Sequence, residues 1–375
     1  MILTPAQEMI RDSVRKFAQR SIAPNAHAWE KAHGYPPTLF GELAELGLMG
    51  MTAPVTYGGA EADYVSYALA LMEIAAADGP LSTIVSVQNS LVIGIILSQG
   101  NETQKKRFLP ELTSARAIGA FALTETEAGS DASAIRTRAK KVSGGYRLDG
   151  TKQFITSGKI AKLALVFALT DPAAGRKGIS AFIVPTDRPG YSVTRVEDKM
   201  GLRASDTCAL AFDDLFVEDD LRLGAEGEGY RIALANLETG RIGIGAQSVG
   251  MAQGALDIAI NYAKERKSFG KPIIEHQAVA HRLADLAAKL EASRQFVLHV
   301  AAVKDTGQPC LKEASMAKLV ASETAEAVCS GAIQTLGGYG YLEEFGVEKF
   351  YRDVRITQIY EGTSDIQRMV IARAL

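Results

Sequence analysis

The sequence predicts a multidomain α+β protein in which a central β domain lies between two helical regions. Apolar residues recur with helical spacing from Thr4 to about Ala117. Short strand-like runs separated by turns follow to about Leu223, and longer helical patterns return from about Gly227. The chain has 375 residues, enough for two or three domains. We therefore predict domains over residues 1–117, 118–225 and 226–375.

The first region shows both the spacing and the start signal of helices. Leu39, Leu43 and Leu46 recur at intervals of four and three, as on the buried face of a helix. Thr4 followed by Pro5 predicts an N-cap and the first helical residue. These patterns indicate an α-helical N-terminal domain.

The second region contains short runs that are broken by turn residues. Ser143-Gly144-Gly145 and Asp149-Gly150 separate such runs in the way that tight hairpins do. Later runs cover residues 163–169, 179–184, 191–196 and 209–212. Short strands at close intervals are typical of a compact antiparallel sandwich or barrel.

The third region contains longer helices. Val279, Leu283 and Leu290 belong to one apolar stripe, and a further helix is expected from near Leu311 to Gly337-Gly338. Glycine is the residue expected just after the last turn of a helix. Long helices joined by short links predict a helical bundle.

Composition narrows the classes of partner and compartment. The formal net charge of −2 disfavours a general nucleic-acid or membrane-surface binder. The most apolar stretch, Ser90–Leu97, is shorter than the ~20 residues of a membrane span, and the N-terminus lacks the apolar core of a signal peptide. Cys208, Cys310 and Cys329 are far apart, which favours reduced thiols. We expect a cytoplasmic protein without nucleic-acid or membrane partners.

Several common active-site motifs are missing. No G-x-G-x-x-G follows a strand, and neither a phosphate-binding G-x-x-x-x-G-K-[ST] loop nor a G-x-S-x-G nucleophile turn occurs. His276 and His281 are five residues apart, so they do not form H-E-x-x-H. We expect no metal site.

The segment Tyr360–Arg368 is the sharpest local signal. Ser364 and Gln367 have the spacing of a capping box, which predicts a helix start and leaves Glu361 on the preceding loop. Gly362 permits unusual backbone angles and the close approach of a ligand. A carboxylate on such a loop can project into a cavity, although an exposed loop glutamate is the alternative.

Two other segments carry polar groups suited to a phosphate-rich ligand. Residues 121–131 supply hydroxyls, small side chains and free backbone N–H groups where helices give way to strands. Residues 266–272, with Gln277 nearby, supply an arginine that could grip a pyrophosphate. Taken alone, the first could be a hydroxyl-rich interdomain loop and the second a charged helix end.

Together these segments resemble the acyl-CoA dehydrogenase family over essentially the whole chain, in order and spacing. Further matching segments are Asp198–Ser205, Gly240–Ile242, Gln334–Gly340 and Tyr351–Asp353. The resemblance implies a helical N-terminal domain, a middle β domain and a C-terminal four-helix bundle. It also implies a homotetramer built as a dimer of dimers.

The resemblance assigns roles to individual residues. Glu361 matches the catalytic base, and because the alternative family position for the base is Gly240 here, Glu361 is the only candidate of the two. The matched FAD contacts are Phe121, Leu123, Thr124, Ser130, Phe154, Ile155, Thr156, Arg266, Phe269, Gln277, Gln334, Leu336, Gly337, Gly338, Thr363 and Asp365. The matched substrate contacts are Ser130, Glu238, Arg241 and Gly362. Two departures from the family pattern are Phe154, where many members have tryptophan, and Thr126-Glu127 in place of a common Pro-Gly.

The implied reaction is FAD-dependent α,β-dehydrogenation of an acyl-CoA to the trans-2-enoyl-CoA. Glu361 would remove the α-proton, hydride would pass to flavin N5, and an electron-transfer flavoprotein would accept the electrons. Ser205 and Gly240–Ile244 look most like short-chain, butyryl-type members, with short branched chains and carrier-protein thioesters still open. Alternatives are a flavin monooxygenase or an acyl-CoA oxidase of the same fold, and a non-enzymatic flavoprotein scaffold.

Overall fold

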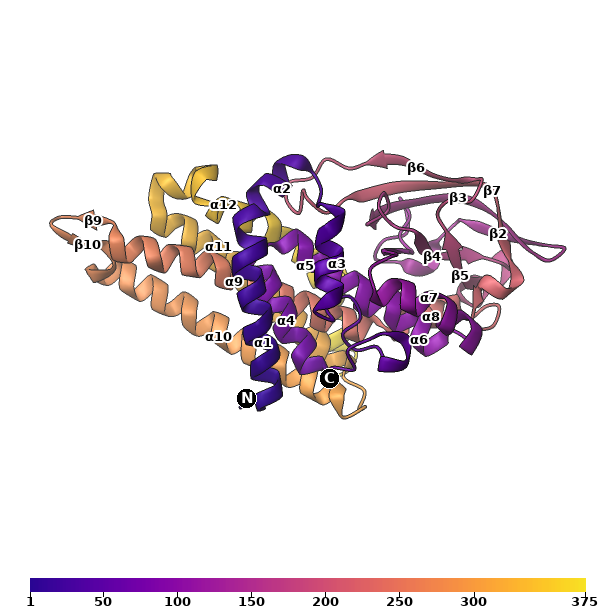
Figure 1. The fold of residues 1–375 in the computed structure, drawn as a ribbon, viewed down its shortest axis with the longest axis horizontal. Helices are drawn as coiled ribbons and strands as arrows, with labels where there is room; N and C mark the ends of the chain where they lie inside the picture. Colours follow the sequence, from indigo (N-terminus) through magenta and orange to yellow (C-terminus); the bar gives the residue numbers. More distant parts are fainter.

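The computed structural model describes residues 1–375 and places the sheet at one end of the molecule and the long helices at the other (Figure 1). The N-terminal part is helical, as the sequence predicted. Its helices are α1 (Pro5–Phe17), α2 (Ala26–Ala32), α3 (Pro37–Glu45), α4 (Tyr64–Ala77), α5 (Gly79–Ser86), α6 (Gly94–Gln99) and α7 (Glu102–Thr113).

The first helix begins where the sequence predicted. The Thr4 side chain accepts a hydrogen bond from the Gln7 N–H, and the Gln7 side chain accepts one from the Thr4 N–H, so a complete capping box precedes Pro5. Acidic Glu8 in the first turn and basic Arg15 and Lys16 in the last turn both complement the helix dipole.

The apolar segment after α4 is longer than the sequence indicated. The predicted limits, Ser90–Leu97, were wrong. α5, a π-helical stretch (Val87–Ile93) and α6 run on as one helix over Gly79–Gln99, which is long and apolar enough to cross a membrane by length and composition alone. However, 83% of its most apolar window is buried inside the fold. Its hydropathy is therefore explained by packing between the sheet and the helices.

The middle domain is an eight-stranded sheet. Its strands are β1 (Gly119–Ala122), β2 (Arg138–Val142), β3 (Gly145–Thr156), β4 (Leu163–Leu169), β5 (Ile179–Pro185), β6 (Tyr191–Val196), β7 (Thr207–Glu218) and β8 (Arg222–Leu223), with the order β6-β7-β3-β2-β4-β5-β8 and β1 beside β4. Most pairs are antiparallel, as expected, but β1–β4 and the single β2–β4 bridge are parallel. β1 can pair in parallel because the chain reaches it from α7 rather than through a hairpin.

The C-terminal domain is built from three long helices, α9 (Leu237–Glu265), α10 (Gln277–Asp305) and α11 (Leu311–Leu336), which begins and ends as predicted. The short helices α8 (Gly229–Ala235), α12 (Val347–Val354) and α13 (Ser364–Ala372) complete it. A hairpin of β9 (Lys267–Ser268) and β10 (Lys271–Pro272) projects from the far end of α9 (Figure 1). The predicted helical bundle is therefore present; it contains three long helices, and the other helices of this domain are short.

Two hydrophobic cores divide the molecule. One joins the N-terminal helices to α9–α12, and the other joins the sheet to the apolar helix and α7. A buried ionic cluster ties the three domains together. Lys349 on α12 lies 2.9 Å from Asp78 at the start of α5 and 2.6 Å from Asp353, and Asp353 also accepts from the Leu202 N–H of the middle domain.

Candidate functional site

A cavity of about 350 Å³ lies where the sheet, the apolar helix, α9 and α13 meet. This volume is in the range of small-ligand sites. The structure brings ten of the predicted site residues to its wall: Phe121, Leu123, Thr124, Ser130, Phe154, Ile155, Thr156, Arg241, Glu361 and Gly362. An adjoining cavity of about 320 Å³ shares Thr83, Phe154, Thr156 and Tyr360 with it.

Glu361 projects from a left-handed turn just before α13. Its φ is 55° and that of Gly362 is 88°, so both residues occupy the region that non-glycine residues avoid. The Glu361 carbonyl accepts from Gln367 Nε2, and the Gly362 carbonyl accepts from Gln367 Nε2 and from Lys318 Nζ. The Glu361 N–H has no hydrogen-bond partner in the protein. The turn therefore leaves one N–H free at the cavity wall.

The helix cap after this turn differs by one residue from the prediction. Thr363, not Ser364, is the N-cap, and its hydroxyl accepts from the Ile366 N–H. Gln367 does not close a capping box, because its amide donates to the Glu361 and Gly362 carbonyls instead. The predicted helix start is confirmed, and the predicted box is wrong because the turn uses Gln367 to hold itself.

Glu361 is half-buried and lines the cavity. Burial raises the pKa of Glu361 to about 7, against the opposing charges of Arg241 and Lys318. A Cβ built on Gly240 would lie 2.9 Å from Glu361 Oε2, so the absence of a side chain at Gly240 makes room for the carboxylate. A weak acid with a pKa near neutrality is suited to proton transfer.

Glu361→Gln should stabilise the fold, and increasingly so as the pH rises. Because the folded pKa of Glu361, about 7, exceeds its ordinary value of 4.5, ionisation destabilises the folded state progressively between these two pH values. We expect the variant to gain about 3 kcal/mol over the wild type at pH 8 and little at pH 4.5. Denaturant titrations of both proteins at these pH values check this, and a pH-independent difference would contradict it.

The loop after β1 is held by a buried ion pair that sequence reasoning missed. Lys152 Nζ lies 2.8 Å from Glu125 Oε1 and 3.0 Å from the Leu123 carbonyl oxygen, and Glu125 also accepts from the Thr137 N–H. The Lys152 side chain has no exposed surface. The sequence feature that could have revealed this pair is Lys152, a charged residue within strand β3. Polar and apolar residues do not alternate regularly in β3, so the sequence pattern did not show that Lys152 is buried.

The cavity wall fits a flat aromatic cofactor. Phe154 lies at a β-bulge of β3, has a φ of 58°, and is 63% exposed, so the bulge turns its ring out of the sheet. The Thr124 and Thr156 hydroxyls beside it form no hydrogen bond within the protein. An exposed ring between unpaired hydroxyls offers both stacking and hydrogen bonding to a planar heterocycle.

The predicted substrate residues separate into two groups. Arg241 is 3% exposed, lines the cavity and donates from Nη1 to Ser315 Oγ, while its Nε has no partner. Glu238, one turn earlier on α9, is not on the cavity wall and pairs with Lys304 at 2.9 Å. Arg241 therefore belongs to the surroundings of Glu361, whereas Glu238 lies at the outer side of the same helix start.

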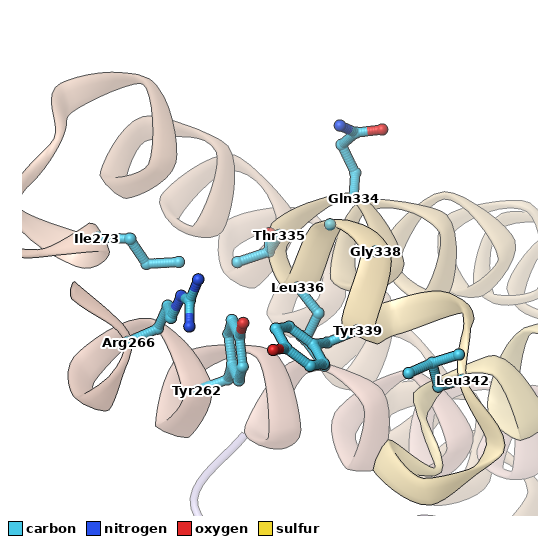
Figure 2. A pocket seen from close by; sticks show the side chains of 10 residues that line it. Tyr262, Arg266, Ile273, Gln334, Thr335, Leu336, Gly338, Tyr339 and Leu342 are labelled. Atoms are coloured by element: carbon cyan, nitrogen blue, oxygen red, sulfur yellow. The ribbon is translucent and has the colours of Figure 1, made fainter. Parts of the chain in front are cut away.

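The other predicted cofactor residues lie at the opposite end of the bundle. A second cavity of about 380 Å³ is lined by Arg266, Gln334, Leu336, Gly337 and Gly338 together with Tyr262 and Tyr339 (Figure 2). The Arg266 guanidinium lies over the Tyr339 ring, 5.5 Å from its centroid. Arg241 and Arg266 are 25 residues apart along α9, or roughly 37 Å at 1.5 Å per residue.

Four of the predicted cofactor residues line neither cavity. Phe269, at the tip of the β9–β10 hairpin, is 98% exposed, and Gln277 begins α10. Thr363 caps α13, and the Asp365 side chain is 93% exposed. Within one chain, Phe269 and Gln277 are therefore not gathered with the site around Glu361, whereas Thr363 and Asp365 lie next to it at the start of α13.

Comparison with known proteins identifies the family. Residues 4–116, 120–215 and 227–375 match the N-terminal, middle and C-terminal domains of acyl-CoA dehydrogenase, respectively. The chain belongs to the acyl-CoA dehydrogenase family. The three matches follow the same order as the helical, β and helical regions of this acyl-CoA dehydrogenase fold.

Individual relatives agree over their full lengths. The chain is 47% identical to "Acyl-CoA dehydrogenase" of Bacillus subtilis (strain 168), covering 100% of this chain and 99% of the relative. It is 45% identical to the mitochondrial "Short-chain specific acyl-CoA dehydrogenase" of Bos taurus, covering 99% and 90%. The solved structure of butyryl-CoA dehydrogenase from Megasphaera elsdenii superposes with a TM-score of 0.97 at 40% identity, covering 100% and 99%.

Gly240→Ala should reduce activity without loss of stability in this family member. The new Cβ would lie within 3.1 Å of all three carboxyl atoms of Glu361, so the carboxylate must move, whereas alanine favours the helix. We expect kcat/KM to fall by about 10- to 100-fold, as for a misplacement of about 1 Å. The matched control is Gly41→Ala in α3, where a Cβ meets no atom within 4 Å. Equal activity of both variants would contradict the packing of Glu361 against Gly240.

Proposed function

We propose that this protein catalyses the FAD-dependent α,β-dehydrogenation of a short-chain acyl-CoA to the trans-2-enoyl-CoA. The observation that carries the proposal is the half-buried carboxylate of Glu361, which shares one cavity wall with a free backbone N–H and with Phe154, Thr124 and Thr156. Each chemical role of the reaction thereby has a candidate group. The short-chain relatives support the choice of substrate class.

Glu361 acts as the base that removes the α-proton of the thioester. A carboxylate with its ordinary pKa of 4.5 would be too weak, and burial raises the pKa of Glu361 to about 7. Arg241 and Lys318 act in the opposite direction and keep a useful fraction of the group ionised at neutral pH. The free N–H of Glu361 is available to donate to the thioester oxygen as negative charge develops there.

Flavin, when bound, supplies a hydride acceptor for the β-hydrogen. The Phe154 ring and the unpaired hydroxyls of Thr124 and Thr156 would hold its ring system, with Ser130 at the edge of the same wall. The Glu125–Lys152 pair fixes the loop that carries Thr124. These residues bind and orient the cofactor against the cavity that receives the acyl chain.

The second cavity supports a shared cofactor site between two copies of the chain. Arg266 and the Gln334–Gly338 segment are too far along the bundle to meet a flavin beside Thr156 of the same chain, yet they carry groups suited to a pyrophosphate. We propose a homotetramer in which a partner copy supplies them. Light scattering should give about four times the 40.0 kDa of one chain, and a monomer mass would contradict the assembly.

The acyl-chain preference can be tested directly. Val87, Leu91 and Ile244 are apolar residues of the cavity wall, and the cavity volume of about 350 Å³ suits a short acyl group. We expect a higher kcat/KM for butyryl-CoA than for palmitoyl-CoA, with an electron-transfer flavoprotein as the acceptor. A preference for palmitoyl-CoA would overturn the short-chain assignment, and a preference for carrier-protein thioesters would replace CoA as the carrier.

A further inference from the structure

Lys318 is a buried lysine on α11. Its buried neighbours on this helix are the alanines Ala314 and Ala321 and the serines Ser315 and Ser322, and its own residue has no exposed surface. No carboxylate lies within ion-pair distance of its Nζ, and burial lowers the pKa of Lys318 to about 8. Placing an unpaired ammonium group in such surroundings is unfavourable, and leucine or methionine would fill the space without that penalty. The amine therefore requires an explanation other than packing.

The single contact of the amine is with the turn that carries Glu361. Lys318 Nζ donates to the Gly362 carbonyl at 2.8 Å, and Gln367 Nε2 donates to the same carbonyl at 2.9 Å and to the Glu361 carbonyl at 3.1 Å. Lys318 is not on the cavity wall. The two carbonyls of the turn are thus held from the protein side, while the carboxylate of Glu361 lies on the cavity side.

The turn needs such a restraint because its backbone is unfavourable. A left-handed conformation is disfavoured at a residue with a side chain, and Glu361 has a φ of 55°. Such a conformation persists only where neighbouring groups hold it. Among those neighbours, Lys318 is the only one that carries charge, and its charge opposes that of Glu361.

We propose that Lys318 is a positioning residue for the base: its ammonium group holds the Gly362 carbonyl and thereby fixes the left-handed turn from which Glu361 projects. This rests on the proposed function only in so far as Glu361 is the base. Lys318 touches neither substrate nor cofactor, so it acts through the turn. Its charge also favours the ionised form of Glu361.

The other groups around Glu361 limit the expected size of the effect. Arg241 faces it from α9, Tyr67 from α4, and Tyr360 from its own loop. Arg241 remains in any variant of Lys318 and continues to favour the carboxylate. We therefore expect the loss of the ammonium charge to raise the pKa of Glu361 by about one unit, at the lower end of the effect of a neighbouring opposite charge.

Two variants separate the charge from the hydrogen bond. Lys318→Met removes both, Lys318→Gln keeps a donor for the Gly362 carbonyl, and Lys312→Met on the same helix is the matched control. In the flavin-bound protein without substrate, infrared difference spectra against Glu361→Gln report the titration of this carboxyl. We expect the pKa to rise by about one unit in both variants and to stay unchanged in the control.

The activity profiles distinguish the two contributions further. In Lys318→Gln, kcat/KM for butyryl-CoA should return close to the wild-type level at a pH well above the raised pKa, because the turn is still held. In Lys318→Met it should remain about tenfold or more below wild type at every pH, because the turn is loosened. If Lys318→Met does not fold, Lys318→Gln carries the test through its infrared titration.

Unchanged titration of Glu361 and overlapping pH profiles in a folded Lys318→Gln, with only a lower Tm, would overturn the proposal and leave Lys318 a structural residue. The infrared titration needs no turnover. If the wild type does not oxidise acyl-CoA, the proposed function fails, while the titration still decides whether Lys318 controls Glu361.

Discussion

Replacing Glu361 with glutamine should lower kcat/KM for butyryl-CoA by about 10²- to 10⁴-fold, the usual contribution of a positioned base. Glutamine has nearly the same shape, and the contacts that hold the turn use the main-chain carbonyls, so the site should remain intact. Only the group that accepts the α-proton is lost. Steady-state kinetics with a dye acceptor measure the effect, and the flavin content reports that the site is preserved.

The control for this variant is Glu344→Gln, which removes an exposed carboxylate that does not line the cavity. Its kcat/KM should equal that of the wild type. A Glu361→Gln variant that retains more than about a tenth of wild-type activity would show that another group removes the proton. The assignment of the base would then have to be abandoned, although the family membership would stand.

Lys349→Met should destabilise the protein by about 3–5 kcal/mol. Lys349 is the cation between Asp78 and Asp353, at 2.9 and 2.6 Å, and both carboxylates are fully buried. Methionine fills the same space but leaves two buried negative charges next to each other. Because Asp353 also accepts from the Leu202 N–H, the loss should loosen the junction of all three domains. The shift of the denaturant midpoint measures the effect.

The matched control is Lys31→Met, because Lys31 has a side chain that is 65% exposed and a loose ion pair 3.7 Å from Glu343. It should change stability by less than about 1 kcal/mol. Adding Asp353→Asn to Lys349→Met should restore part of the lost stability by removing one of the two unpaired charges. A Lys349→Met variant as stable as the control would show that the cluster contributes little.

Much of the fold was predictable because local signals agree with the tertiary structure. The Thr4–Pro5 start of α1 and the end of α11 at Gly337 are encoded by side chains that act within one turn. The parallel pairing of β1 with β4 was not predictable from local patterns, since it depends on where the end of α7 lies relative to the sheet. The predicted capping box at Ser364 was wrong because the Gln367 side chain donates to the Gly362 carbonyl in the preceding turn instead.

Most residues of the site were predicted from the resemblance of their sequence segments to a known family. That resemblance named Glu361 and the residues of the flavin loop, and the structure places them around one cavity. Lys318 and the Glu125–Lys152 pair were missed because a lysine within a helix or strand is ordinarily solvent-exposed. The useful signal for Lys318 was its position among the small residues of α11, where one long charged side chain interrupts a run of alanine and serine on the buried face.

Glu361 and a bound flavin are expected to act together on a short acyl thioester. Anaerobic addition of butyryl-CoA to the flavin-bound protein, followed by the visible absorbance of oxidised flavin, tests this most directly. We expect rapid bleaching in the wild type and none in Glu361→Gln. A wild-type protein that binds flavin but stays oxidised with short, branched and long acyl-CoAs would contradict it.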